Sequence, residues 1–254
     1  MLMYIHSGRN PFMGGLVVLV LVASVILRVV LGPGDTRRRS SGLVGLLANL
    51  GLSGLSRDPR SASFQLLGDK LAFSSFSPGR DYEFVTGWNF LGFLSQGEDR
   101  YAFNILGGTY HDQKLFVYDY HFRFGPGDDN ERYYTMFMLI EQECFPQILI
   151  EPKSSEDIFS RAANLITNND IKFESAEFSR TYRVRSGDKK FAYDVCNPQM
   201  MDFLLSNGNL RIEIQGPVIL LAHSPQVPVD AIELGLERLA QIRSLLPEYL
   251  FTTK

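Results

Sequence analysis

The stretch KLFVYDYHFRF, residues 114–124, contains the side chains of this chain that are best suited to chemistry. Asp119, His121 and Arg123 alternate there with apolar and aromatic residues. Side chains two positions apart on a strand point to the same side, about 7 Å apart. A histidine near a carboxylate can serve as a general base or a metal ligand. The simpler interpretation, to which we give more weight, is a polar strand face that is solvent-facing or half buried.

A second polar cluster lies in residues 173–186, FESAEFSRTYRVRS. Arg183 and Arg185 are two positions apart, so they would share a strand face and could bind an anionic ligand or a phosphoryl headgroup. Cross-strand ion pairs with the many acids of this region are the alternative interpretation. The remaining charged residues of the cluster are Glu174, Glu177 and Arg180.

The sequence predicts no metal, no cofactor and no assignable catalytic residue. A metal site needs three or more ligands, and the histidines are spread along the chain at positions 6, 111, 121 and 223. The acidic loop 128–131 lacks EF-hand spacing. No G-x-S-x-G, P-loop or dinucleotide fingerprint is present. Cys144 and Cys196 have no metal-site spacing, and we expect two buried thiols.

The charge of the chain is unevenly distributed. The whole chain carries −3, and seven arginines and two aspartates fall in the first 60 residues, so Ser61–Lys254 carries −8. Neutralisation of phosphates by basic side chains dominates the affinity for nucleic acids. We therefore exclude nucleic acid as a partner of the acidic region.

An apolar run near the N-terminus predicts a transmembrane helix at Phe12–Leu31. The run is 20 residues long and apolar except for Ser24 and Arg28, which suffices to span the ~30 Å hydrocarbon core of a bilayer. Arginines 37–39 follow it, whereas the tail 1–11 has a single arginine. Positive residues favour the cytoplasmic side, so we expect the large domain in the cytoplasm. A cleaved secretory signal is the weaker alternative, because arginines occupy the place of a cleavage site.

The linker after this helix spans residues 32–60. Gly32-Pro33-Gly34 should end the helix, and the predicted contacts with the bilayer are Phe12–Leu31 together with Arg37, Arg38 and Arg39. Leu43–Leu55 is apolar but too short to cross a membrane. It is either an interfacial helix lying on the membrane or a Gly/Leu linker, and the sequence favours neither.

The soluble region 61–254 shows mainly the two-residue period of strands. Arg100–Tyr110 and Lys114–Phe124 look like a hairpin around His111-Asp112-Gln113. Residues 133–140 are apolar on both faces, which is typical of a central strand covered on both sides. The other expected strands are 82–86, 132–143, 148–151 and 173–186, and a hairpin of 209–215 with 218–222 across Gly216-Pro217.

Helices are expected in the second half of the chain. Ser154-Ser155-Glu156-Asp157 is a helix start, and short helices are expected at 188–193 and 198–205. The last helix should begin at an Asp230 cap and bury Ile232, Leu236, Leu239, Ile242 and Leu246. The layout predicts an α+β domain, an antiparallel β-sheet with helices packed on one face.

The segment Phe173–Asn207 resembles a family of uncharacterised bacterial single-pass membrane-anchored proteins. The resembling pattern is F-E-S-x-E-F-x-R-x-Y-R-V-R, followed by F-A-Y and P-x-M-M. Asn104–Tyr110 and the V-x-D-Y-H strand ending at His121 also fit, and the resemblance covers Asp81–Phe251. It implies an anchor plus a soluble α+β domain in the bacterial inner membrane. The family has no assigned activity, so the resemblance implies no functional residue.

The sequence therefore predicts a non-catalytic binding module that is tethered to a membrane and binds a protein partner or a small anionic ligand. One alternative is a hydrolase-like or metal-dependent enzyme with a site near Asp119 and His121. A second is a lipid-contacting adaptor that uses Leu43–Leu55. Convergence of Asp119, His121 and Arg183 on one pocket would favour the enzyme.

Overall fold

The computed structural model of the chain describes residues 58–125, 130–153 and 170–251. The predicted transmembrane helix Phe12–Leu31, the segment Leu43–Leu55 and the helix expected from Ser154 lie outside these ranges. Among the residues that are described, no helix is long and apolar enough to cross a bilayer.

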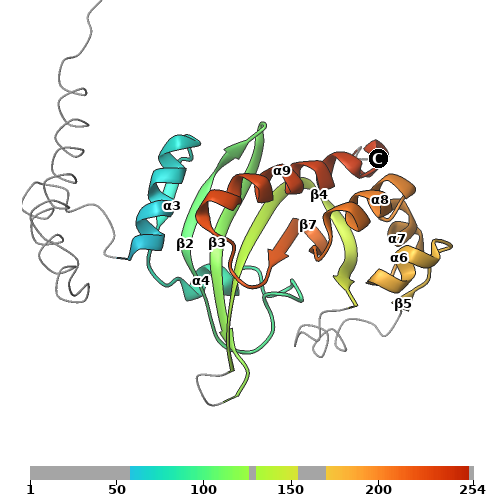
Figure 1. Cartoon of the computed structure of the whole chain (residues 1–254), viewed down its shortest axis with the longest axis horizontal. Helices are drawn as coiled ribbons and strands as arrows, with labels where there is room; N and C mark the ends of the chain where they lie inside the picture. The colour runs from blue at the N-terminus through green and yellow to red at the C-terminus, as the bar shows by residue number, and fades with distance from the viewer. Residues whose placement is uncertain (1–57, 126–129, 154–169, 252–254) are drawn as a thin grey trace, which may run out of the picture. The chain divides into compact units, whose positions relative to one another are not determined.

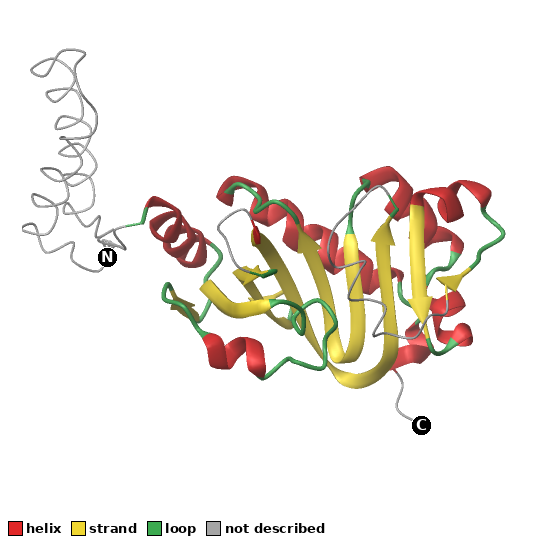
Figure 2. Ribbon diagram, turned by 90° about the horizontal axis from the view of Figure 1, so that it is seen from below, coloured by secondary structure: helices red, strands yellow, loops and turns green. Residues whose placement is uncertain are grey.

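The centre of the domain is an antiparallel sheet, seen in Figure 2 as a layer of strands with helices along it. The described residues form seven strands in the order β1-β2-β3-β4-β6-β5, with β7 paired to β4. The α+β prediction is thus confirmed in its antiparallel sheet and packed helices. The strands are β1 Ser75–Ser77, β2 Glu98–Tyr110, β3 Gln113–Arg123, β4 Glu131–Pro152, β5 Asp170–Ile171, β6 Tyr182–Ser186 and β7 Arg211–His223.

Strand β4 holds the sheet together because it pairs with three other strands. It pairs with β3 through residues 131–139, with β6 through 148–152, and with β7 through 135–150. The prediction of separate strands at 132–143 and 148–151 was wrong, since the pairing is only irregular between Ile140 and Ile148. The hairpin predicted across Gly216 was wrong as well: Gly216 pairs with Phe145 at φ +55° inside the continuous strand β7. A glycine with positive φ lets a strand bend without ending it.

One face of the sheet is covered by most of the helices, and α9 crosses it in Figure 1. The apolar stripe of α9 is buried as its periodicity predicted. Asp230 does not cap this helix, because it lies in the short 3-10 turn η3 Val229–Ala231 and Ala231 occupies the cap position. The helices on this face are α3 Pro59–Lys70, α6 Ala176–Thr181, α7 Lys189–Val195, α8 Pro198–Asn207 and α9 Ile232–Leu245; the described chain ends in the 3-10 turn η4 Glu248–Phe251.

The opposite face is covered by helix α4, Tyr82–Thr86, and by the loop that follows it. Helices therefore do not lie on one face alone. The strand predicted at 82–86 was wrong because Asp81 starts a helix there, its carboxylate accepting a hydrogen bond from the Phe84 N–H at 2.7 Å. The apolar loop residues Leu91, Phe93 and Leu94 pack on the sheet beneath.

Two further elements differ from the expected ones in type. The strand predicted at 173–186 is right only for Tyr182–Ser186, since Ser175 caps helix α6 just before it. The linker predicted to end at residue 60 contains the first turn of α3, which has Asp58 as its cap and Pro59 at its first position. Pro and a capping aspartate together are a helix-start signature that the pattern of apolar residues did not show.

Candidate functional site

Asp119 is fully buried on the helix-covered face of β3, in a network of hydrogen bonds. Its carboxylate accepts from Arg60 Nε at 2.7 Å and Nη2 at 2.8 Å, from Asn104 Nδ2 at 2.9 Å and from Thr135 Oγ1 at 3.1 Å. Arg60 also donates to the Val227 carbonyl at 2.9 Å. A carboxylate with four donors around it is held in its place. Asp119 thus joins the first turn of α3 to β2, β3 and β4.

His121 is also buried, in a stack of aromatic rings. Its ring lies 4.5 Å from that of Tyr101 and 4.8 Å from that of Tyr133, measured between centroids. Nδ1 is 3.0 Å from the Asp99 carbonyl, and Nε2 is 3.8 Å from Glu131 Oε1 without a hydrogen bond. The half-buried or solvent-facing polar face that we expected for Asp119 and His121 is therefore buried, because α3 and neighbouring rings cover it.

Arg123, the third residue of this face, ends β3 and is half-buried. In the sheet it lies opposite Glu131 on β4 and Glu98 on β2. The face therefore contains an internal ion-pair network, a ring stack and a strand end. Asp119 and His121 do not line a pocket with Arg183.

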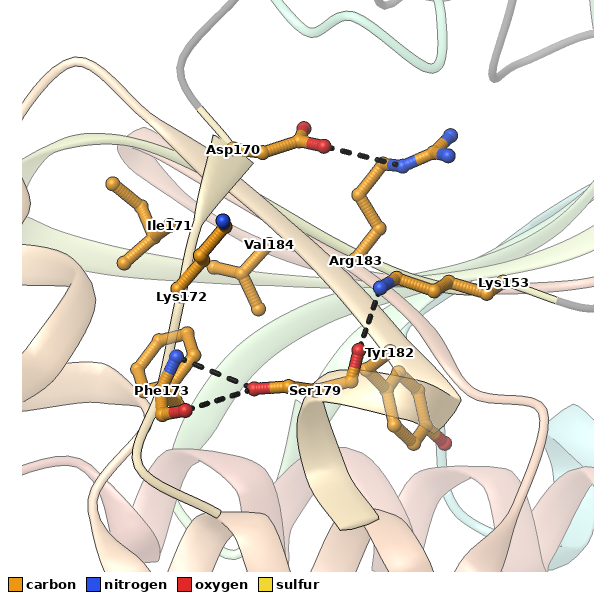
Figure 3. A pocket seen from close by; sticks show the side chains of 9 residues that line it. All are labelled: Lys153, Asp170, Ile171, Lys172, Phe173, Ser179, Tyr182, Arg183 and Val184. Carbon is orange, nitrogen blue, oxygen red and sulfur yellow. Dashed lines mark hydrogen bonds and ion pairs between the residues drawn. The ribbon is translucent and has the colours of Figure 1, made fainter. Parts of the chain in front are cut away.

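Arg183 lies instead in a pocket of about 230 Å³ between β5, β6 and α6 (Figure 3), which we call the β5–β6 pocket. Of the charged residues in the two clusters predicted from the sequence, only Arg183 lines this pocket. The lining contains both apolar and charged residues. The lining residues are Lys153, Asp170, Ile171, Lys172, Phe173, Ser179, Tyr182, Arg183 and Val184.

Three cations and one anion surround the β5–β6 pocket. Lys153 Nζ donates to the Ser179 carbonyl at 2.6 Å, which leaves it two further N–H donors. Arg183 Nε is 3.7 Å from Asp170 Oδ2, and it is buried without a hydrogen bond. The ammonium group of Lys172, which is exposed, makes no hydrogen bond or ion pair with any described residue. The local balance is thus positive in a region whose overall charge is −8.

Arg185 forms internal ion pairs, as the alternative interpretation of the arginine cluster expected. Its side chain is 8% exposed, with Nε 3.3 Å from Asp170 Oδ1 and Nη1 3.6 Å from Glu151 Oε2. Asp170 therefore stands between two arginines. It is closer to the buried Arg185 than to Arg183.

Sequence reasoning missed Lys153, Lys172 and Asp170 as parts of this site. No spacing links them to Arg183, because Lys153 follows β4, Asp170 lies in β5 and Lys172 follows β5. The sequence offered only a weak signal. Lys153 follows the predicted strand 148–151, and Lys172 precedes the predicted strand 173–186. Only the pairing of β4 and β5 with β6 brings them together.

Two titratable groups on β7, Glu213 and His223, lie outside these clusters and have shifted pKa values. The carboxylate of Glu213 on β7 accepts from the Gly92 N–H at 2.6 Å and the Phe93 N–H at 2.8 Å, and burial raises its pKa to about 7. At the end of the same strand, burial lowers the pKa of His223 to about 4, and Arg238 and Arg211 add to this shift. Glu213 thus fixes the loop over the second face of the sheet.

The two cysteines differ in burial. Cys144 is exposed and Cys196 is buried, so the expectation of two buried thiols was wrong for Cys144, which lies in the irregular part of β4. Burial raises the pKa of the Cys196 thiol. In the described ranges, no group of three or more His, Cys, Asp or Glu side chains is arranged to hold a metal ion.

Fold and site together define an acidic α+β domain with a small cationic pocket at the edge of an antiparallel sheet. No family model and no curated protein matches the chain. Among solved structures, it is similar to the crystal structure of the mycobacterial trehalose monomycolate transport factor A, TtfA. The TM-score is 0.52 at 16% identity, over 74% of this chain and 96% of that one. At this identity the likeness concerns the fold alone.

Proposed function

We propose that the chain is a membrane-anchored binding module whose α+β domain recognises a small anionic ligand in the β5–β6 pocket. The observation that carries the proposal is the pocket itself. Lys153, Lys172 and Arg183 surround it in a region with a net charge of −8. Cationic groups gathered against the overall charge of a domain would concentrate an anion at that place.

The same geometry supports binding rather than catalysis. The hydroxyl of Ser179, the one serine in the pocket lining, donates to the Phe173 carbonyl and accepts from the Phe173 N–H. A nucleophile needs a base within hydrogen-bond reach, and neither Asp119 nor His121 lines this pocket. The enzyme alternative near Asp119 loses its main support, because that carboxylate is surrounded by the donors of Arg60, Asn104 and Thr135.

The membrane part of the proposal rests on the sequence. Phe12–Leu31 would span the bilayer, and arginines 37–39 would hold the linker at the cytoplasmic headgroups. The acidic domain would be repelled by anionic lipid and would project into the cytoplasm. TtfA is named as a transport factor; our proposal does not depend on that role.

The test is a thermal unfolding experiment on the full chain in neutral detergent, with phenyl phosphate as the probe. At 100 times its Kd, a ligand adds about 2.7 kcal/mol of stability, which for a domain of this size raises Tm by roughly 5–10 °C. Benzyl alcohol and sodium chloride at matched ionic strength serve as controls. We expect the shift to fall by half or more in Lys172→Gln and in Arg183→Gln. A folded protein whose Tm no anion changes would overturn the proposal.

A further inference from the structure

Asp170 occupies the position from which an anionic group would contact Arg183. We propose that Asp170 is an internal competitor of the ligand: a phosphomonoester or carboxylate enters the β5–β6 pocket and takes Arg183, while Asp170 stays with Arg185. This inference rests on the proposed function and adds the ligand class and its regulation. Figure 3 shows Asp170 and Arg183 joined at one side of the pocket.

The distances indicate which of the two contacts of Asp170 is weaker. Its Oδ1 is 3.3 Å from Arg185 Nε, and its Oδ2 is 3.7 Å from Arg183 Nε. The second distance is too long for a hydrogen bond, and Arg183 Nε is buried without one. A buried donor without a partner is costly. Asp170 does not remove that cost, because its oxygen is too far from Arg183 Nε. A ligand oxygen within hydrogen-bond distance of Nε would remove it.

The lining of the pocket defines the chemical class of the ligand. A guanidinium pairs best with planar or tetrahedral oxyanions through two parallel hydrogen bonds, and Lys172 has no partner of its own in the described structure. Ile171, Val184 and Phe173 add apolar residues to the lining of the pocket. The volume of about 230 Å³ is smaller than that of sites for drug-sized molecules. The ligand is therefore a small oxyanion with an apolar or aromatic body.

Asp170 also opposes the ligand through its charge. Its side chain is 57% exposed, so water screens its charge in part. A unit charge about 6 Å from the ligand, in a medium between protein surface and water, changes affinity by about 3–10-fold. Removing the charge of Asp170 should therefore tighten binding by that factor. Glu174 and Glu177 are also close in sequence, but neither lines the pocket.

The experiment measures the Kd of phenyl phosphate by calorimetry on the full chain in neutral detergent. We expect Asp170→Asn to lower Kd about 3–10-fold and Arg183→Gln to raise it more than tenfold. The double variant should bind more weakly than Asp170→Asn, because it lacks the guanidinium that the ligand would take. Glu177→Gln on α6 is the matched control; it removes an acid outside the pocket and should change Kd less than twofold. Circular dichroism checks the fold, and Asp170→Ser replaces Asp170→Asn if that variant unfolds.

Different failures have different meanings. If the wild-type chain does not bind, the proposed function itself fails. If it binds and Arg183→Gln weakens binding, but Asp170→Asn changes Kd less than twofold, only the competition by Asp170 is refuted. Equal tightening by Asp170→Asn and Glu177→Gln would also refute it, because net charge alone would then explain the effect.

The same chemistry could come from a lipid headgroup or from a soluble metabolite, and a second arm separates them. The full chain is reconstituted in nanodiscs of phosphatidylcholine, with or without phosphatidic acid, whose headgroup is a phosphomonoester. A headgroup that reaches the pocket would compete with phenyl phosphate. It would raise the apparent Kd of phenyl phosphate for the wild-type chain and leave the Kd for Arg183→Gln unchanged. An unchanged Kd would assign the site to soluble ligands.

Discussion

Asp119 shows how strongly one buried carboxylate depends on residues far away in the sequence. Arg60, its main partner, is 59 positions away, and Thr135 is 16 positions away on the next strand. The alternation in residues 114–124 correctly predicted that Asp119 and His121 share a face. It could not predict that this face is covered, because Arg60 belongs to a segment that we had assigned to the linker, and Tyr101 and Tyr133 come from the neighbouring strands. The sequence of a single strand does not distinguish a buried polar face from an exposed one.

Asp119→Asn should destabilise the domain by about 2–4 kcal/mol. The change removes the charge that neutralises Arg60, whose side chain is 24% exposed, and leaves an amide that repels two of the former donors. Urea unfolding of the full chain in detergent measures the loss. Asp112→Asn, in the exposed turn between β2 and β3, should cost less than about 0.5 kcal/mol. A loss below about 1 kcal/mol for Asp119→Asn would contradict the structural role.

Glu213 and His223 should act in opposite directions on stability as pH changes. The raised pKa of Glu213, about 7, means that its contribution is present below the unfolded value of 4.5 and is lost as pH rises through 7. The lowered pKa of His223, about 4, means that its contribution is present above 6.5 and is lost as pH falls through 4. Each shift corresponds to about 3 kcal/mol, so the two effects largely cancel in the wild-type chain.

Single variants should reveal this cancellation. In Glu213→Gln, the free energy of unfolding should fall as the pH is lowered from 7 to 4, because only the His223 effect remains. With His223→Phe it should rise over the same interval. Denaturant titrations at several pH values give both slopes, and the wild-type chain is the reference. Parallel profiles for all three proteins would refute the assignment.

Among the elements, helix α9 comes unusually close to the sheet at one point. A Cβ added to Gly235 would lie 2.2 Å from the Phe137 ring on β4. This glycine therefore permits contact between helix and strand. The apolar stripe predicted which side of α9 is buried, but the pattern gives no distance between helix and sheet.

Gly235→Ala should destabilise the domain although alanine favours helices. The gain in helix propensity is about 1 kcal/mol, and an overpacked core costs about 1–3 kcal/mol, so we expect a net loss of up to about 2 kcal/mol. The control Gly187→Ala makes the same change where nothing lies within 4 Å, and it should be neutral. Thermal unfolding compares the two. A stabilised Gly235→Ala variant would show that α9 can move away from Phe137 at little cost.

The elements that were predicted wrongly all depend on interactions that the period of apolar residues does not contain. Alternation at 82–86 and 173–181 is compatible with strands, but Asp81 and Ser175 accept hydrogen bonds from the backbone three residues on and start helices. At Gly216 and in the middle of β4, a bend inside one strand looks like a turn between two. These choices depend on local hydrogen bonds and on partner strands, and periodicity contains neither.

At the scale of the whole molecule, the orientation in the membrane is the prediction with the simplest test. Cys144 is exposed and Cys196 is buried, so a membrane-impermeant maleimide should label one position. With a cytoplasmic domain, cells become labelled only after permeabilisation. Cys144→Ser should abolish the signal. Labelling of intact cells would place the domain outside.

The long strand β4 also determines when the domain can be completed during synthesis. Its residues 135–150 pair with β7, whose last paired residue is His223. While β1 to β4 leave the ribosome, this apolar edge of β4 has no partner, and more than 70 residues separate Thr135 from β7. An unpaired apolar strand edge invites contacts with other chains. We expect nascent chains from which β7 has not yet emerged to require a chaperone, and the emergence of β7 to end that need.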